Sequence, residues 1–286
     1  MLGAIEAGGT KFVCAVSDDQ LNIVERISIP TETPTETLAQ VFAFFDRYPI
    51  KSMGVGSFGP IDINEASATY GYITSTPKIK WQDVDLLGQL KARYDVPMAW
   101  TTDVNAAAYG ELILGAANGK SSCLYLTIGT GVGGGAIVNG EILHGFGHPE
   151  MGHIKVKRME SDEFEGICPF HGDCVEGLVA GPALEARVGM KGQQVPENHY
   201  VWRTQAYYIA QALMNYSLVL SPEVIVLGGG VMHQQQLFPL IRKELKRLMA
   251  DYVALPEMEA FVVPTMLGNN SGIIGCLALA KEKNNK

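Results

Sequence analysis

Residues 124–138 read Leu-Tyr-Leu-Thr-Ile-Gly129-Thr130-Gly131-Val-Gly-Gly-Gly-Ala-Ile-Val, an apolar run that enters a Gly-Thr-Gly turn and returns as a second apolar run. This pattern predicts a β-hairpin, and the turn Asn139-Gly140 predicts a third strand at Ile142-Leu143. Glycine has no Cβ to block an approach, so the bare amides of such a turn can come close to a ligand.

The same pattern occurs near the start of the chain. Residues 2–6 and 12–16 predict two strands joined by Gly8-Gly9-Thr10-Lys11, and residues 21–29 predict a third strand. For this segment alone, an ordinary hairpin turn explains the residues as well. The matched pair predicts an internal duplication of a β-meander that opens each half of the chain, with two Gly-Thr hairpins able to hold a polyphosphate between two lobes.

The rest of the chain alternates strands with helices, which predicts an α/β fold. Its length of 286 residues allows two lobes, which we expect at 1–117 and 118–286, with the last helix able to pack back on the N-terminal lobe. Apolar spacing predicts strands starting at 52 and covering 96–100, 223–227 and 261–263, and helices at 35–48, 81–94, 106–114, 177–188, 200–220, 235–250 and 272–281.

Composition and charge limit the class of function. The net charge of -8 and the lack of a basic run argue against a nucleic-acid partner. The N-terminus has no basic start and meets a carboxylate at Glu6, so we expect no signal peptide, and no apolar run is long enough for a membrane span. We therefore expect a cytoplasmic protein, with Cys14, Cys123 and Cys276 in apolar surroundings as core residues.

The other two cysteines belong to a polar, turn-rich stretch. Cys168, His171 and Cys174 follow one another at intervals of three residues, and His153 stands upstream. Two sulfur and two nitrogen ligands suit tetrahedral zinc, and four protein ligands leave no open position for catalysis. We expect a structural zinc site; the alternative is two buried cysteines and some surface histidines.

Three carboxylates are candidates for substrate chemistry. Glu150 and Glu176 flank the metal-binding residues and could accept hydrogen bonds from a polyol, unless they are simply solvated. Asp103 lies at a strand-to-helix junction, where it is either a helix N-cap or a carboxylate able to take a proton from a substrate hydroxyl. The glycines Gly228-Gly229-Gly230 end a buried strand, where a nucleotide base or ribose could lie against the backbone.

Taken together, these motifs resemble the ROK sugar kinases, which have the actin-like, hexokinase-type ATPase fold, and in particular their bacterial fructokinase branch. The resemblance runs along nearly the whole chain. It rests on Glu6-Ala-Gly-Gly-Thr-Lys11, Gly59-Pro60, Thr102-Asp-Val-Asn105, Thr127 to Gly135, Glu150-Met-Gly-His153, Cys168 to Glu176 and Leu227-Gly-Gly-Gly230.

The resemblance implies a two-lobed, duplicated ribonuclease H-like fold with a zinc-binding loop, and phosphorylation of a hexose by ATP with Mg²⁺. It implies Asp103 as the catalytic base and His153, Cys168, His171 and Cys174 as zinc ligands. The implied sugar-binding residues are Gly59, Asn105, Glu150, His153 and Glu176. The implied ATP-binding residues are Gly9, Thr10, Lys11, Gly129, Thr130, Gly131, Pro182, Gly228, Gly229 and Gly230.

Three positions depart from the broad family pattern. Most members have Asp in place of Glu6, and that Asp is expected to reach Mg²⁺ through water. Most members also have Asn in place of Thr102. Many glucose-type members have a third cysteine where this chain has His171. All three departures resemble the fructokinase branch, so we expect D-fructose as the substrate and fructose 6-phosphate as the product. Glucose and mannose stay open, because Glu150, Glu176 and the loop near Thr76 would decide one hydroxyl's orientation.

Two other classes of protein are alternatives. The family includes transcriptional repressors that sense sugars, but these carry a DNA-binding module before the first hairpin, whereas here the first strand is expected within a few residues of Met1. An actin-like assembly protein would have no use for the zinc loop or for the paired carboxylates. Related kinases are often dimers, so a homodimer is compatible with the resemblance.

Overall fold

The computed structural model describes residues 1–285, which form two compact units. Unit 1 consists of Met1–Gly119, Ile142–Pro149 and the chain from Met266 onward. Unit 2 consists of Lys120–Glu141 and Glu150–Thr265. Neither unit is a single continuous segment: besides the last helix, residues 142–149 belong to unit 1, although the expected bounds place them in the C-terminal lobe.

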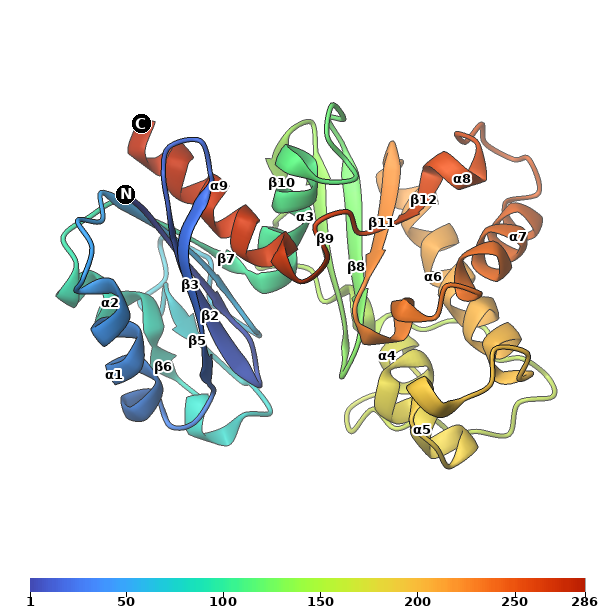
Figure 1. The fold of residues 1–286 in the computed structure, drawn as a ribbon. Coiled ribbons are helices and arrows are strands. Elements are labelled where there is room, and N and C mark those ends of the chain that lie inside the picture. Colours follow the sequence, from blue (N-terminus) through green and yellow to red (C-terminus); the bar gives the residue numbers. More distant parts are fainter. Residues whose placement is uncertain (286) are drawn as a thin grey trace. The chain divides into compact units, whose positions relative to one another are not determined.

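The sheet of unit 1 has the strand order β3-β2-β1-β4-β7 (Figure 1). Strands β1 to β3 form an antiparallel meander, and β4 and β7 continue it in parallel with β1. The strands are β1 (Leu2–Ala7), β2 (Lys11–Ser17), β3 (Ile23–Pro30), β4 (Ser52–Ser57) and β7 (Met98–Thr102).

The sheet of unit 2 repeats this arrangement, with the order β10-β9-β8-β11-β12. Strands β8 and β9 are antiparallel, and β11 and β12 follow in parallel. The strands are β8 (Cys123–Ile128), β9 (Val132–Val138), β10 (Glu141–Ile142), β11 (Val224–Gly228) and β12 (Val262–Pro264). The identical order confirms the predicted duplication of a β-meander.

Helices complete both units. Unit 1 contains α1 (Pro34–Phe45), α2 (Leu86–Arg93), α3 (Asp103–Leu114) and α9 (Ser271–Asn285), together with the short strands β5 (Tyr72–Ile73) and β6 (Val84–Asp85). Unit 2 contains α4 (Val175–Val179), α5 (Gly181–Val188), α6 (Val201–Leu220), α7 (Leu237–Met249) and α8 (Met258–Phe261).

Two predicted helices differ from the structure. The helix expected at 81–94 begins only at Leu86, because Val84 and Asp85 pair with β5 and the Asp85 side chain caps the helix by accepting a hydrogen bond from the Gly88 amide. The helix expected at 177–188 is divided at Ala180, whose extended backbone ends α4 and begins α5.

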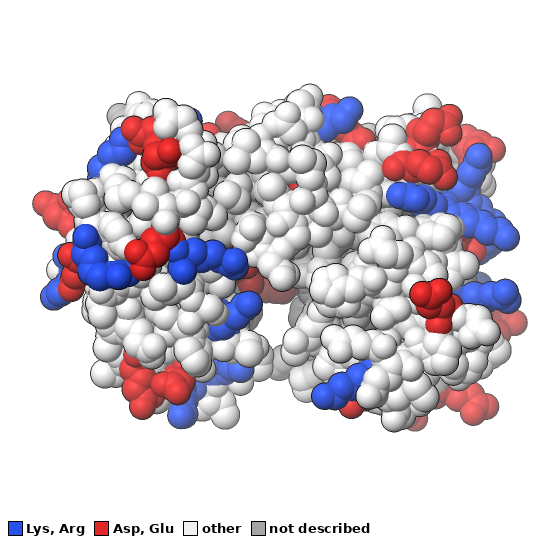
Figure 2. All heavy atoms as spheres, viewed as in Figure 1, with Lys and Arg blue, Asp and Glu red and all other residues white. Residues whose placement is uncertain are grey.

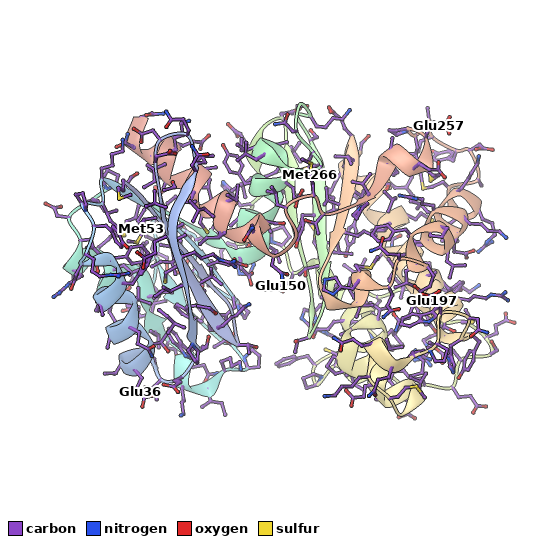
Figure 3. All side chains as sticks on the ribbon, viewed as in Figure 1. Glu36, Met53, Glu150, Glu197, Glu257 and Met266 are labelled. Carbon is purple, nitrogen blue, oxygen red and sulfur yellow. The ribbon has the colours of Figure 1, made fainter. Side chains whose placement is uncertain are left out.

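Strand β4, between β1 and β7, has one face toward each of the two layers of unit 1. Met53 and Val55 belong to the core that α1 and α2 cover, and Figure 3 shows Met53 inside this layer with Glu36 at the outer end of α1. The alternate residues Gly54 and Gly56 face α9, because side chains of a strand alternate between faces.

Helix α9 packs closely on β4 and α3. A Cβ at Gly54 would collide with the backbone of Cys276, and one at Gly275 would collide with the backbone of Ala106 in α3. Glycine at these positions therefore permits direct backbone contact between the elements. This packing holds α3, and with it Asp103, against the sheet of unit 1.

On the face shown in Figure 2, acidic and basic side chains lie mainly near the edges, with a group of basic side chains at the right over α7 and a largely uncharged middle. Among the helices formed by residues 1–285, none has the length and apolar character needed to cross a membrane.

Candidate functional site

The four predicted metal ligands come together in unit 2. The ligand atoms of His153, Cys168, His171 and Cys174 all lie within 4.8 Å of one another. The Nδ1 atom of His153 lies 3.7 Å from the Cys168 Sγ and 3.6 Å from the Cys174 Sγ, while the two histidine Nδ1 atoms are 3.3 Å apart. The prediction that these residues form one cluster is confirmed.

These separations fit a tetrahedral metal site. Zinc with bonds of about 2.3 Å to sulfur and about 2.0 to 2.1 Å to nitrogen places sulfur and nitrogen roughly 3.6 Å apart, and two nitrogens roughly 3.3 Å apart. Burial raises the pKa of the Cys174 thiol to about 11, so a bound cation is needed to hold this group as a thiolate at neutral pH. The cluster thus fits a metal ion in its donor types and in its spacing.

The local backbone explains how three ligands fit into seven residues. Cys168 and Gly172 exchange two backbone hydrogen bonds of 3.1 and 2.9 Å, which close a tight loop around His171. Gly172 has a φ of 63°, a value that favours glycine, so the chain can reverse there and deliver Cys174 to the start of α4.

The longer connection from His153 to Cys168 is held by side chains of two helices. Asp162 in this connection pairs with Arg187 of α5, and the Tyr208 hydroxyl of α6 donates to its Oδ2 at 2.6 Å. Gln211 of α6 accepts from the Lys157 amide at 2.9 Å and donates to the Lys157 carbonyl at 3.1 Å. The metal cluster is thereby fixed to the helical layer of unit 2.

His153 also connects the cluster to a candidate sugar ligand. Its Nδ1 faces the metal ligands, and its Nε2 lies 4.0 Å from the Oε1 of Glu176. The other oxygen of Glu176 accepts a 2.9 Å hydrogen bond from the Val132 amide at the second glycine hairpin. A carboxylate behind a metal-bound histidine orients the ring, so the metal cluster, Glu176 and the hairpin are one connected arrangement.

The predicted ATP-binding residues of unit 2 lie near one another. The Gly181 amide donates to the Gly129 carbonyl at 2.7 Å, which places Pro182 next to the hairpin that contains Thr130 and Gly131. A Cβ on Gly129 would lie 3.7 Å from the amide nitrogen of Gly230, and Gly229 adopts a φ of 89° because its backbone passes close to Ile128. The arrangement brings glycine backbone from two segments, 129–131 and 228–230, close together, where no side chain blocks the approach of a phosphate group.

The first hairpin lies in unit 1. Gly8 donates to the Lys11 carbonyl at 3.0 Å, and the exposed Thr10 accepts at its carbonyl a 3.0 Å hydrogen bond from the Thr31 amide. The side chain of Lys78 passes over Gly9, where a Cβ would lie 3.4 Å from the Lys78 Cε. A second cation beside Lys11 was not expected from the sequence, because Lys78 lies in a loop 67 residues further along.

Asp103 is the first residue of α3, and the interpretation of Asp103 as the N-cap is wrong. The cap is Thr102, whose Oγ1 accepts from the Asn105 amide at 3.2 Å. This gives a physical reason for threonine at 102, since threonine is a good N-cap. Asp103 itself is half-buried in the first turn of the helix, where the helix dipole favours a negative charge. Asn105 is buried and its Nδ2 donates to the Thr101 hydroxyl at 3.2 Å.

Glu6 lies in the same part of unit 1 as Asp103. Its Oε2 atom is shielded from solvent without a hydrogen-bond partner, and Gly272 of α9 leaves the space that the carboxyl group fills. Burial, and next the negative charge of Asp103, raise the pKa of Glu6 to about 7. The two carboxyl groups are therefore electrostatically coupled.

The predicted sugar residue Gly59 lies in a loop braced by a histidine that the sequence analysis did not identify. The Ile61 amide donates to the Nε2 of His148 at 3.0 Å, and a Cβ on Gly59 would lie 3.3 Å from the same ring. The only sign in the sequence of a role for His148 was weak, namely its position two residues before Glu150. Glu150 itself is exposed, and its carbonyl accepts from the His153 amide at 3.1 Å.

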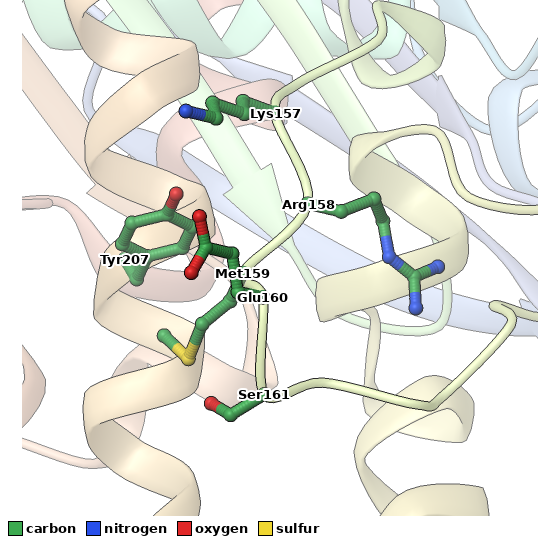
Figure 4. A pocket seen from close by; sticks show the side chains of 6 residues that line it. All are labelled: Lys157, Arg158, Met159, Glu160, Ser161 and Tyr207. Carbon is green, nitrogen blue, oxygen red and sulfur yellow. The ribbon is translucent and has the colours of Figure 1, made fainter.

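A separate hollow of about 370 Å³ lies in unit 2 and is lined by Lys157 to Ser161 and by Tyr207 (Figure 4). Lys157 and Arg158 point in different directions, and an Arg158 Nη donates to the Asp162 carbonyl at 2.8 Å. The two cations do not converge on a common point, and none of the predicted site residues lines this hollow.

Comparison with known proteins gives consistent matches along the whole chain. The model of the ROK family matches residues 2–283. A fructokinase from Pediococcus pentosaceus is 48% identical over 281 residues, which is 98% of each protein. A fructokinase from Streptococcus mutans is 47% identical over 288 residues, which is 99% of this chain and 98% of that protein. The solved structure of a ROK hexokinase from Thermus thermophilus has a TM-score of 0.80 and 26% identity, covering 99% of each chain.

Proposed function

Because this chain belongs to the ROK family, we propose that it is an ATP-dependent hexose kinase that converts D-fructose to fructose 6-phosphate. Its fold is the duplicated, actin-like sugar kinase fold of that family. The observation that carries the proposal is the near-full-length identity of 48% and 47% to two proteins named fructokinase. The Cys/His cluster, with Glu176 Oε1 4.0 Å from the Nε2 of His153, agrees with this proposal.

Asp103 is the proposed catalytic base. It would orient the primary hydroxyl of the hexose and accept its proton while the γ-phosphoryl group is transferred. Phosphoryl transfer depends mainly on alignment and on stabilisation of charge, so the fixed position of Asp103 matters as much as its basicity. Thr102 holds the first turn of α3 by capping it, and the backbone contact of α3 with α9 fixes the helix in unit 1.

The two glycine hairpins are the proposed phosphate-binding elements. Their amides, together with the side chains of Thr10, Lys11 and Thr130, would bind the phosphates of ATP, and Pro182 and Gly228 to Gly230 would contact the nucleoside. Mg²⁺ bound with the nucleotide would supply charge neutralisation on the phosphates. Glu6 is the carboxyl group of unit 1 that we propose faces this ion through water.

The metal cluster is proposed to hold structural zinc. Its four ligands leave no open coordination position, so the ion would stabilise the loop and not activate water. Its function would be to fix His153 and Glu176, which we propose bind the sugar together with Gly59, Asn105 and Glu150.

The proposal is tested by measuring ADP release from MgATP with fructose, glucose, mannose and N-acetylmannosamine in parallel, with Asp103→Asn as the blank. Release that is greatest with fructose is the expected result. A different preferred hexose would keep the kinase and reject fructose as the substrate. Sugar binding without any sugar-dependent ADP release would favour a non-catalytic sugar sensor.

A further inference from the structure

We infer that His148 is a positioning residue for sugar binding, which holds the Gly59-Pro60-Ile61 loop through the hydrogen bond from the Ile61 amide. This inference rests on the proposed function and deepens it. The two residues are 87 positions apart in the sequence, and both belong to unit 1. The 3.0 Å separation and the ring nitrogen acceptor make this a well-formed hydrogen bond.

The loop is otherwise held from one side. The Pro60 carbonyl accepts from the Thr74 amide at 2.8 Å and from the Thr74 hydroxyl at 3.0 Å, and Ile61 forms a bridge with Ile73. These contacts all come from the segment around β5. His148 is the partner that holds the Ile61 amide from a different segment, Ile142–Pro149.

The imidazole ring of His148 lies against the loop at Gly59, where there is no side chain in its way. A Cβ at Gly59 would lie 3.3 Å from the Cε1 and 3.5 Å from the Nε2 of His148, the first of which is closer than most Cβ contacts. The glycine therefore lets the imidazole lie against the backbone of the loop. This close approach explains glycine at position 59 without reference to a bound ligand.

The chemistry of the ring makes the contact specific. An imidazole nitrogen accepts a hydrogen bond only when it carries no proton, so the bond assigns the tautomer of His148 with its proton on Nδ1. A phenylalanine would fill the same space but would leave the Ile61 amide without an acceptor. A glutamine could present its carbonyl oxygen near the position of the Nε2.

The hydrogen bond connects His148 to one part of the proposed sugar site. His148 binds the Gly59-Pro60-Ile61 loop, in which Gly59 is a proposed sugar ligand. A loss of the hydrogen bond would therefore loosen the loop at 59–61. This loop contains none of the proposed ATP-binding residues, so sugar binding should change more than ATP binding.

The test compares His148→Phe and His148→Gln with His144→Phe, an exposed histidine of the same segment. We expect His148→Phe to raise the KM for fructose at least about 5-fold, the effect of leaving one buried donor unsatisfied, with the KM for ATP within about 2-fold. His148→Gln and His144→Phe should stay close to the unaltered protein. Should His148→Phe fail to fold, His148→Asn, whose amide is too short to reach Ile61, replaces it.

Hydrogen exchange of the Ile61 amide gives a readout that needs no substrate. Faster exchange in His148→Phe or His148→Asn, restored in His148→Gln, is the expected result. An unchanged fructose KM in the variants that remove the acceptor, or equal rises in both KM values, would overturn the inference. If the unaltered protein shows no sugar-dependent ADP release, the proposed function fails, while the exchange measurement still decides whether His148 holds the loop.

Discussion

Replacing Glu111 with glutamine should destabilise unit 1 far more than an ordinary charge-to-amide change. Glu111 lies on α3, is fully buried, and accepts four hydrogen bonds. Its Oε1 accepts from the Leu267 amide at 3.1 Å and the Ser271 hydroxyl at 2.7 Å. Its Oε2 accepts from the Ala116 amide at 2.7 Å and the Met266 amide at 3.2 Å.

The magnitude follows from the geometry of the amide. Glutamine keeps one oxygen and replaces the other with an NH₂ group. With the NH₂ group at the position of Oε1, the Ser271 hydroxyl can accept from it and donate to the Gly268 carbonyl 2.9 Å away, so the Leu267 amide is the donor that faces another donor. A buried donor left unsatisfied costs about 1–3 kcal/mol, so the expected loss is at least of this size. The four donors belong to the residues that follow α3 and to the chain that leads into α9, so the effect should be concentrated there.

The assay is urea unfolding combined with hydrogen exchange on peptides that contain residues 115–117 and 266–271. We expect faster exchange in both peptides and a lower free energy of unfolding. Glu185→Gln, at an exposed position on α5, is the matched control and should change the stability by less than about 0.5 kcal/mol. A loss below about 1 kcal/mol in Glu111→Gln, with both peptides unchanged, would refute the assignment of Glu111 as the acceptor of these four groups.

Three further changes test other parts of the molecule. Asp103→Asn should lower kcat by about 10² to 10⁴ with little change in the KM for ATP, and near-native turnover would reject its role as the base. All five cysteines are buried. Removal of metal by a chelator should loosen the loop that holds Cys168 and Cys174 and make these two thiols reactive in the folded protein, while Cys14, Cys123 and Cys276 react only after unfolding. Metal removal should also lower the free energy of unfolding and raise the KM for fructose. Full activity and unchanged thiol reactivity after proven metal loss would contradict the structural role of the metal. The pKa of Glu6 is raised from 4.5 to about 7, so Glu6 binds its proton more tightly in the folded than in the unfolded protein. The stabilisation that comes from this bound proton is complete below pH 4.5 and is lost as the pH rises to 7. Without nucleotide, the free energy of unfolding relative to that of Glu6→Gln should fall by about 3 kcal/mol over this pH range. A difference that stays constant with pH would show that the pKa of Glu6 is not raised.

The duplicated sheets and the metal cluster could be predicted from the sequence because their signals are local. The paired Gly-Thr hairpins each lie within a short stretch, and three of the four metal ligands lie within seven residues. Local spacing of this kind can be recognised in the sequence without knowledge of the tertiary fold. The fourth ligand, His153, was placed correctly because four ligands complete a tetrahedral set.

The parts that were missed depend on contacts between distant segments. Glu111 has the appearance of an ordinary helix residue, and its importance arises only when residues 155 and more positions away turn back onto α3. His148 depends on Ile61 in the same way. The role of Asp103 at the start of α3 stayed open between an N-cap and a substrate carboxylate for a different reason: both Thr102 and Asp103 are good caps, and only the backbone shows which residue precedes the first turn.

The discontinuity of unit 1 has a consequence for how the protein is made. Helix α9, which contacts β4 and α3 through bare backbone, is synthesised after all of unit 2. At a synthesis rate of about 5–20 residues per second, the strands of unit 1 wait roughly 8–30 s for this helix after residue 119 has been added. During that interval the glycine face of β4 is uncovered on the ribosome, and we expect nascent chains stopped before α9 to be held by chaperones and cut by proteases within unit 1.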